Sequence, residues 1–98
     1  MGSVSIRDWG RIQLDTCEMI TIKTKSGRNC DITATDWGFY LGSSLNARLK
    51  REGFKVALVR NSLGKFFINV VEKDKVSLFE EYLIQEKSRV VTWLDEQS

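Results

Sequence analysis

Two stretches of the chain alternate apolar and polar residues on either side of a short turn sequence. A period of two predicts half-buried strands, and the turns at Ser26-Gly27 and at residues 61–64 predict that the flanking strands pair as antiparallel hairpins. Only a sheet with one apolar face can bury such a pattern. The predicted strands are residues 11–14, 19–25, 28–35, 54–60 and 65–72.

The segments that follow the hairpins carry apolar residues at helical spacing. Leucines recur at every fourth position, at Leu41, Leu45 and Leu49. This spacing predicts a helix over residues 37–51, and Asp36 before it is a suitable N-cap. The pattern after Asp74, which would cap it, predicts a second helix over residues 75–95. We therefore expect an α+β fold, with one small antiparallel sheet of hairpins, two helices and the order βββ-α-ββ-α.

The length of the chain limits how much core this fold can contain. Its 98 residues fit a single domain, which we predict to span residues 1–98. The residues expected to be buried in one core are Ile20, Ile22, Ile32, Leu41, Leu45, Val56, Leu58, Ile68, Val70, Phe79 and Leu83.

The sequence argues against catalysis, because the residues that usually perform it are missing. The chain contains no histidine, which is the commonest general acid–base and the usual partner of a serine or cysteine nucleophile. It has neither of the glycine-rich motifs that bind nucleotide phosphates. Two cysteines, Cys17 and Cys30, cannot form a common zinc site without histidine. We predict no enzyme activity, no cofactor and no metal.

Two further features of the sequence bear on the cellular location of the protein. No apolar run approaches the roughly 20 residues that span a bilayer. The N-terminus lacks the basic start and the apolar stretch of a signal peptide. We therefore expect a cytoplasmic protein with reduced cysteines and no association with membranes.

The charges are unevenly distributed along the chain. Nine basic and three acidic residues lie between Lys23 and Lys65, whereas four basic and seven acidic residues follow from Phe67 onward. Basic groups on a sheet neutralise phosphates, and an exposed aromatic ring can stack on an unpaired base. We predict a nucleic-acid-binding module, with a merely solvated basic face as the alternative. The predicted binding residues are Lys23, Lys25, Arg28, Lys55, Arg60, Lys65 and Phe67.

The C-terminal segment favours a different class of function. A helix of about 20 residues is longer than a small sheet can cover, so its apolar end would remain exposed. The exposed side chains would be Val90, Trp93 and Leu94, which would form an interface with a second copy or with another protein. In this interpretation the chain is a small inhibitor or adaptor, of cellular or viral origin, that forms a homodimer or docks on a partner. Alternatively, this end folds back onto the segment around Trp9.

Overall fold

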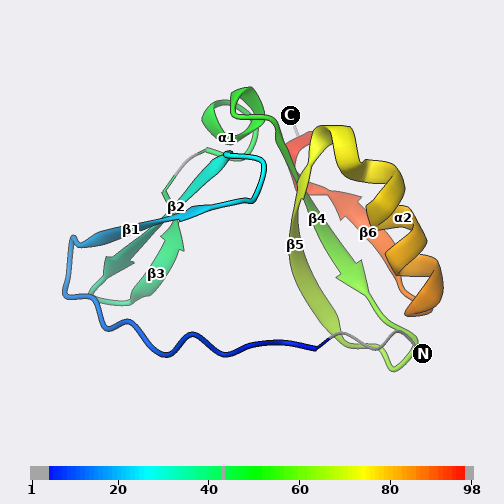
Figure 1. Ribbon diagram of the computed structural model, residues 1–98, viewed down its shortest axis with the longest axis horizontal. Coiled ribbons are helices and arrows are strands. Elements are labelled where there is room, and N and C mark those ends of the chain that lie inside the picture. Colours follow the sequence, from blue (N-terminus) through cyan, green and yellow to red (C-terminus); the bar gives the residue numbers. More distant parts are fainter. Residues whose placement is uncertain (1–4, 43, 97–98) are drawn as a thin grey trace.

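The strands form two separate antiparallel sheets within residues 5–42 and 44–96, the part of the chain that the computed structural model describes. The first sheet has the order β1-β2-β3 and the second the order β5-β4-β6, and the two sheets splay apart from a common end near α1 (Figure 1). The α+β class is confirmed, but the prediction of one sheet is wrong. The elements are β1 (Met19–Lys23), β2 (Asn29–Thr35), β3 (Gly38–Leu41), α1 (Arg48–Arg51), β4 (Phe54–Arg60), β5 (Phe66–Glu72), a 3-10 turn (Lys73–Lys75), α2 (Val76–Gln85), β6 (Arg89–Trp93) and a second 3-10 turn (Leu94–Glu96).

Both predicted hairpins are confirmed, with the registers that period-two alternation requires. In the first, Ile20 lies opposite Ile32, and the amide of Thr24 donates to the carbonyl oxygen of Arg28 across the turn at 2.8 Å. In the second, Val56 lies opposite Val70. Residues directly opposite each other in an antiparallel pair share a face of the sheet, so the first hairpin gathers its apolar residues on one side, whereas the second carries apolar residues on both.

The helix predicted over residues 37–51 is wrong, apart from the single turn of α1. The chain instead turns back at Asp36-Trp37 and adds β3 to the first sheet, with Ala34 opposite Phe39. Asp36 accepts a hydrogen bond from the Thr16 hydroxyl at 2.6 Å and does not cap a helix. Glycine followed by aromatic residues at 38–40 favours an extended strand over a helix. Residue 43 lies outside the described residues.

The second predicted helix is correct only in its first half. Helix α2 ends at Gln85, and Lys87 adopts a left-handed conformation with φ of 54° that reverses the chain. The β-branched run that follows then pairs with β4 as β6. Asp74 does not cap α2, because its carboxylate binds Arg28. The strand predicted over residues 11–14 is also absent from both described sheets, although that segment is extended.

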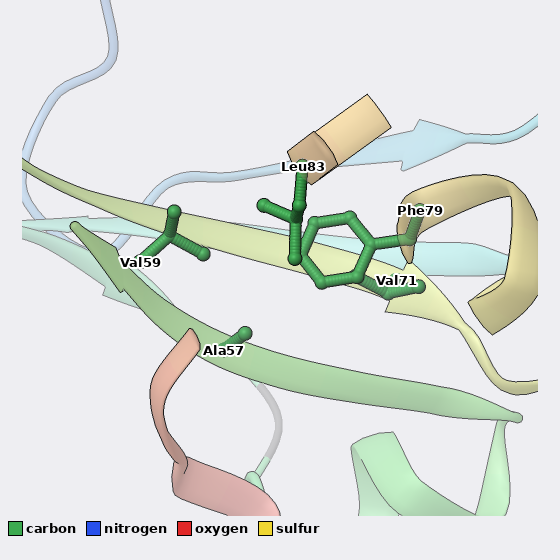
Figure 2. Close-up of a cluster of buried hydrophobic side chains, with 5 residues drawn as sticks. All are labelled: Ala57, Val59, Val71, Phe79 and Leu83. Atoms are coloured by element: carbon green, nitrogen blue, oxygen red, sulfur yellow. The ribbon is translucent and has the colours of Figure 1, made fainter. Parts of the chain in front are cut away.

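Helix α2 covers one face of the second sheet and forms the main core (Figure 2). Phe79 and Leu83 of the helix pack on the sheet residues Ala57, Val59 and Val71. Of the residues predicted to be buried, Val56, Phe79 and Leu83 are buried as expected. Ile22 and Ile68 are 52% and 56% exposed, and Val70 is also exposed, so these three predictions are wrong. These side chains lie on the sheet faces that α2 does not reach.

A second cluster joins the two sheets at their common end. Leu49 of α1 packs with Phe54 and Val56 at the start of β4, and all three are buried. Partly buried residues from the first sheet, the connecting segment and the C-terminal turn complete the cluster: Cys30, Leu41, Leu45 and Leu94. The leucines with helical spacing therefore meet in one cluster, although they belong to a strand, a connecting segment and a short helix.

A buried carboxylate fixes the end of the chain to this cluster. Asp95 is 1% exposed, and its carboxylate accepts the amide of Val56 at 2.9 Å and the ammonium of Lys55 at 3.2 Å. Burial raises the pKa of Asp95, but the hydrogen bonds from Val56 and Lys55 outweigh burial and hold the pKa below its usual range. The pairing between β4 and β6 ends at Ala57 and Trp93. Beyond this point the Asp95 carboxylate, rather than a strand carbonyl, accepts the amide of Val56.

We expect the Asp95→Asn substitution to lower the free energy of unfolding by about 2–4 kcal/mol, because it removes a buried charge that accepts two hydrogen bonds. Urea denaturation at neutral pH would measure this loss. A carboxylate with a lowered pKa stabilises the fold above its unfolded pKa, so the difference from wild type should disappear as the pH falls below about 4. Glu96→Gln, at the exposed partner of Lys55, is the matched control and should have a much smaller effect. Equal effects of the two substitutions would contradict this role of Asp95.

Candidate functional site

The first sheet has an apolar face that no helix covers in the described part of the chain. Because Ile20 lies opposite Ile32 and Ala34 opposite Phe39, all four side chains lie on the same side of the sheet. Phe39 is 72% exposed and Ile22 half exposed, which is unusual for a face that is apolar from edge to edge. The side chains of this face are Ile20, Ile22, Cys30, Ile32, Ala34, Phe39 and Leu41.

Two adjoining cavities follow this face toward the second sheet. The larger has a volume of about 470 Å³ and the smaller about 250 Å³, and Ile22 and Ile32 line both. The smaller cavity also reaches Phe54 and Val70 of the second sheet. The two cavities adjoin along the apolar face of the first sheet, and together we call them the cleft. Its narrow part lies between the two sheets, and its wide part lies between the first sheet and the N-terminal segment.

The opposite wall of the cleft belongs to the face of the second sheet that points away from α2. Val70 lies in the cavity lining, and Ile68 and Phe66 continue the same face along β5 because alternate residues of a strand point the same way. All three are exposed. Both walls of the cleft are thus apolar and in contact with solvent.

The N-terminal segment, residues 5–15, borders the wide part of the cleft. Gly10, Ile12 and Leu14 line the larger cavity, and from there the segment runs on in extended form toward the lower end of the second sheet (Figure 1). Ile6 and Trp9, which lie beyond the lining, are 86% and 93% exposed. This segment carries large apolar side chains for which the described part of the chain offers little packing surface.

A group of ion pairs at the narrow end of the cleft links the β1–β2 turn to the end of β5 and the 3-10 turn after it, and we call this group the clasp. The guanidinium of Arg28, in the β1–β2 turn, lies 3.3 Å from the carboxylate of Glu72 and 2.5 Å from that of Asp74. Glu72 also accepts a hydrogen bond from the Ser26 hydroxyl and pairs with Lys75 at 3.5 Å. The Ser26 hydroxyl, together with Lys75 and Arg28, lowers the pKa of Glu72, and the hydrogen bond from Arg28 lowers the pKa of Asp74.

Glycine is required next to this clasp. Gly53 has φ of +94°, and a Cβ on this residue would lie 2.7 Å from Nε of Arg28. The carbonyl oxygen of Gly53 also accepts the amide of Lys73 at 2.8 Å. The positive φ favours glycine at this position, and the missing Cβ leaves room for the Arg28 side chain beside the start of the second sheet.

The residues predicted to bind nucleic acid fall into separate groups. Arg28 belongs to the clasp, and Lys55 pairs with Asp95 and Glu96 while its ammonium lies 4.7 Å from the centre of the Trp93 ring. Lys23 ends β1 and is exposed, and Lys25 is exposed in the turn that follows. Two of the predicted cations are thus engaged by carboxylates of the chain itself.

The remaining predicted residues lie near the β4–β5 turn. Arg60 ends β4 with its guanidinium 5.9 Å from the centre of the Phe66 ring, and Lys65 follows the turn. Phe67 is half exposed on the α2 side of the sheet, where it lines a cavity of about 150 Å³ with Tyr82. The structure therefore does not gather the predicted set on one face, and nucleic-acid binding remains a prediction.

The residues predicted to form a protein interface pack within the chain. Val90 and Trp93 lie against the core beneath α2, where the Trp93 ring meets Phe79 edge to face at 5.9 Å between centroids. Leu94 packs against the cluster that joins the sheets. Sequence reasoning missed the cleft because it assigned Ile22 and Ile68 to a core. The alternation that predicted their strands is the same whether an apolar face is buried or open.

No family model, no curated protein and no solved structure matches this chain. In the described ranges, no three potential ligands among histidine, cysteine, aspartate and glutamate are grouped so that they could hold a metal ion. None of the described helices has the length and hydropathy needed to cross a membrane. Function must therefore be inferred from the geometry of the cleft.

We expect Glu72→Gln to loosen the junction between the sheets, because the neutral amide weakens its interactions with Arg28 and Lys75. The radius of gyration from small-angle X-ray scattering should rise above the wild-type value, and the urea midpoint should fall. Glu80→Gln, on an exposed position of α2, provides the control and should change neither quantity. An unchanged radius with an unchanged midpoint would show that the clasp does not hold the sheets together.

Proposed function

We propose that this chain is a non-enzymatic protein-interaction module that binds an apolar polypeptide segment in the cleft between its two sheets. The observation that carries this proposal is that both walls of the cleft are apolar and exposed, from Phe39 and Ile22 on one sheet to Val70 on the other. Contiguous exposed apolar faces mark interaction sites in folded proteins.

The openness of the cleft favours a polypeptide over a small molecule. Small-molecule sites enclose most of the ligand surface, whereas Phe39 and Ile22 remain at least half exposed. β2 is the central strand of the first sheet, so β1 and β3 are its edge strands, and no other described strand pairs with them. An extended segment can add main-chain hydrogen bonds at such an edge while its alternate side chains enter the apolar cleft.

The cleft should bind a fluorescein-labelled, lysine-flanked peptide of alternating isoleucine and threonine, as measured by fluorescence anisotropy. Ile22→Asp should abolish binding, because it places a charge in the centre of the apolar wall. Leu78→Asp is the matched control: Leu78 is 60% exposed, close to the 52% of Ile22, but it lies on α2 away from the cleft. Near-ultraviolet circular dichroism would verify that both variants are folded. Equal binding by the two variants would contradict the proposal.

Nucleic-acid binding is a second candidate, favoured by one feature of the second sheet. Arg60 lies directly opposite Arg89 on neighbouring strands, and the Phe66 ring lies beside Arg60. Like charges in opposite positions destabilise a sheet unless an anion lies between them. A phosphate group would supply that anion, and the exposed ring of Phe66 could stack on an unpaired base.

If this second candidate is correct, a labelled single-stranded oligonucleotide should bind at low salt, and its affinity should fall steeply as salt is added. Exchanging Arg60 and Arg89 for glutamate should weaken binding more than the same change at Lys23 and Lys25, which lie on the other sheet. The absence of any anisotropy change at low salt would exclude this candidate. Binding of the oligonucleotide without binding of the peptide, by a chain that light scattering shows to be monomeric, would instead exclude the cleft proposal.

A further inference from the structure

The chain exposes more surface than a compact monomer of its mass. Its accessible surface is 7735 Å², whereas the scaling for monomeric proteins gives about 5,700 Å² at 11.3 kDa. The radius of gyration is 14.6 Å, compared with about 12.5 Å expected for a domain of 98 residues. The excess of about 2,000 Å² is within the area that each subunit of an obligate homodimer buries.

Two apolar features of the described residues are strongly exposed. One is the cleft, with exposed walls on both sheets. The other is the N-terminal segment, on which Ile6, Trp9 and Ile12 are all strongly exposed. Within this segment the Asp8 carboxylate accepts the amide of Gly10 at 2.8 Å, and the outer half of the segment runs on beneath the sheets toward the lower end of the second (Figure 1). Ile6 and Trp9 therefore lie outside the lining of the larger cavity.

We propose that the occupant of the cleft is a second copy of this chain, in a two-fold homodimer where the N-terminal segment of each copy fills the cleft of the other. This inference rests on the proposed function and names the partner of the same site. Each copy contains both halves of the contact, an apolar extended segment and an apolar cleft. In a two-fold dimer the same contact is made twice, so both clefts are filled and both segments are buried.

The charge and the connectivity of the chain permit this arrangement. The formal net charge is only +2, so two copies repel each other weakly. The segment from residue 5 to residue 15 is not part of either described sheet, and its transfer to a neighbour breaks no ladder. Exchange of an identical terminal segment is a common route to a dimer because it requires little rearrangement of the subunit.

The test is the molecular mass of the full chain in solution, by sedimentation equilibrium or by chromatography with light scattering. Wild type should have twice the 11.3 kDa monomer mass. Trp9→Ser should raise the dimer Kd by roughly 100-fold or more, because buried tryptophans dominate interface energies and the dimer contains this contact twice. Trp37→Ser is a matched control from the same Asp-Trp-Gly sequence: Trp37 is 74% exposed but stacks on Tyr40 outside the cleft, and its loss should leave the dimer intact.

A mixing experiment tests the exchange itself. Trp9→Ser lacks a functional segment and Ile22→Asp lacks a functional cleft, so each variant alone should be monomeric. The mixture should recover a heterodimer, because one intact segment can enter one intact cleft. Failure to recover it, or a wild-type dimer that Trp9→Ser does not weaken, would overturn the exchange.

A monomeric wild type would overturn the second copy as the occupant. Were that monomer still to bind the isoleucine–threonine peptide through Ile22, the cleft would remain a protein-interaction site for another partner. A monomer that binds no peptide would overturn both proposals together.

Discussion

One ten-residue helix has to cover the apolar faces of two sheets, and the shape of the molecule follows from this shortage. Helix α2 spans about 15 Å, and three strands are about 10–15 Å wide, so a single helix covers one face of one sheet. It covers the face that carries Ala57, Val59 and Val71. In the described ranges no helix covers the other apolar face of the second sheet or the apolar face of the first sheet, although Ile12 and Leu14 border the latter. The two faces approach each other around the smaller cavity. Because they meet at one end only, an open apolar cleft remains between them.

The junction at that end combines a small apolar cluster with two polar fastenings. Leu49 and Phe54 exclude water between the sheets, while Arg28 reaches from the first sheet to Glu72 and Asp74. On the other side of β4, Asp95 holds the last turn of the chain against Val56. Each ion pair has a partner that is partly shielded from solvent, so it contributes more than an ordinary surface pair. The angle between the sheets, and hence the width of the cleft, depends on these few contacts.

The sequence predicted the hairpins well, because period-two alternation is a local signal that both sheets obey. It failed where several elements share one cluster. Leu41, Leu45 and Leu49 repeat at helical spacing, but they converge from a strand, a connecting segment and a short helix. It also failed at the site: the alternation that places Ile22 and Ile68 on apolar faces carries no information on whether another layer covers those faces. Similarly, nothing near Arg28 in the sequence indicates that its partner Glu72 lies 44 residues further along the chain.

An open cleft also connects the stability of this fold to its occupancy. The described residues bury only eight hydrophobic side chains, a small core for a chain of this length. Any ligand that binds the folded chain alone stabilises it by mass action, by about 2.7 kcal/mol at a concentration one hundred times its Kd. Such a gain is a large part of the stability of a small domain. Since the occupant would extend the core across both sheets, binding would also fix the angle that the narrow junction alone must hold in the free chain. If the cleft binds the occupant proposed above, folding and binding depend on the same apolar surface.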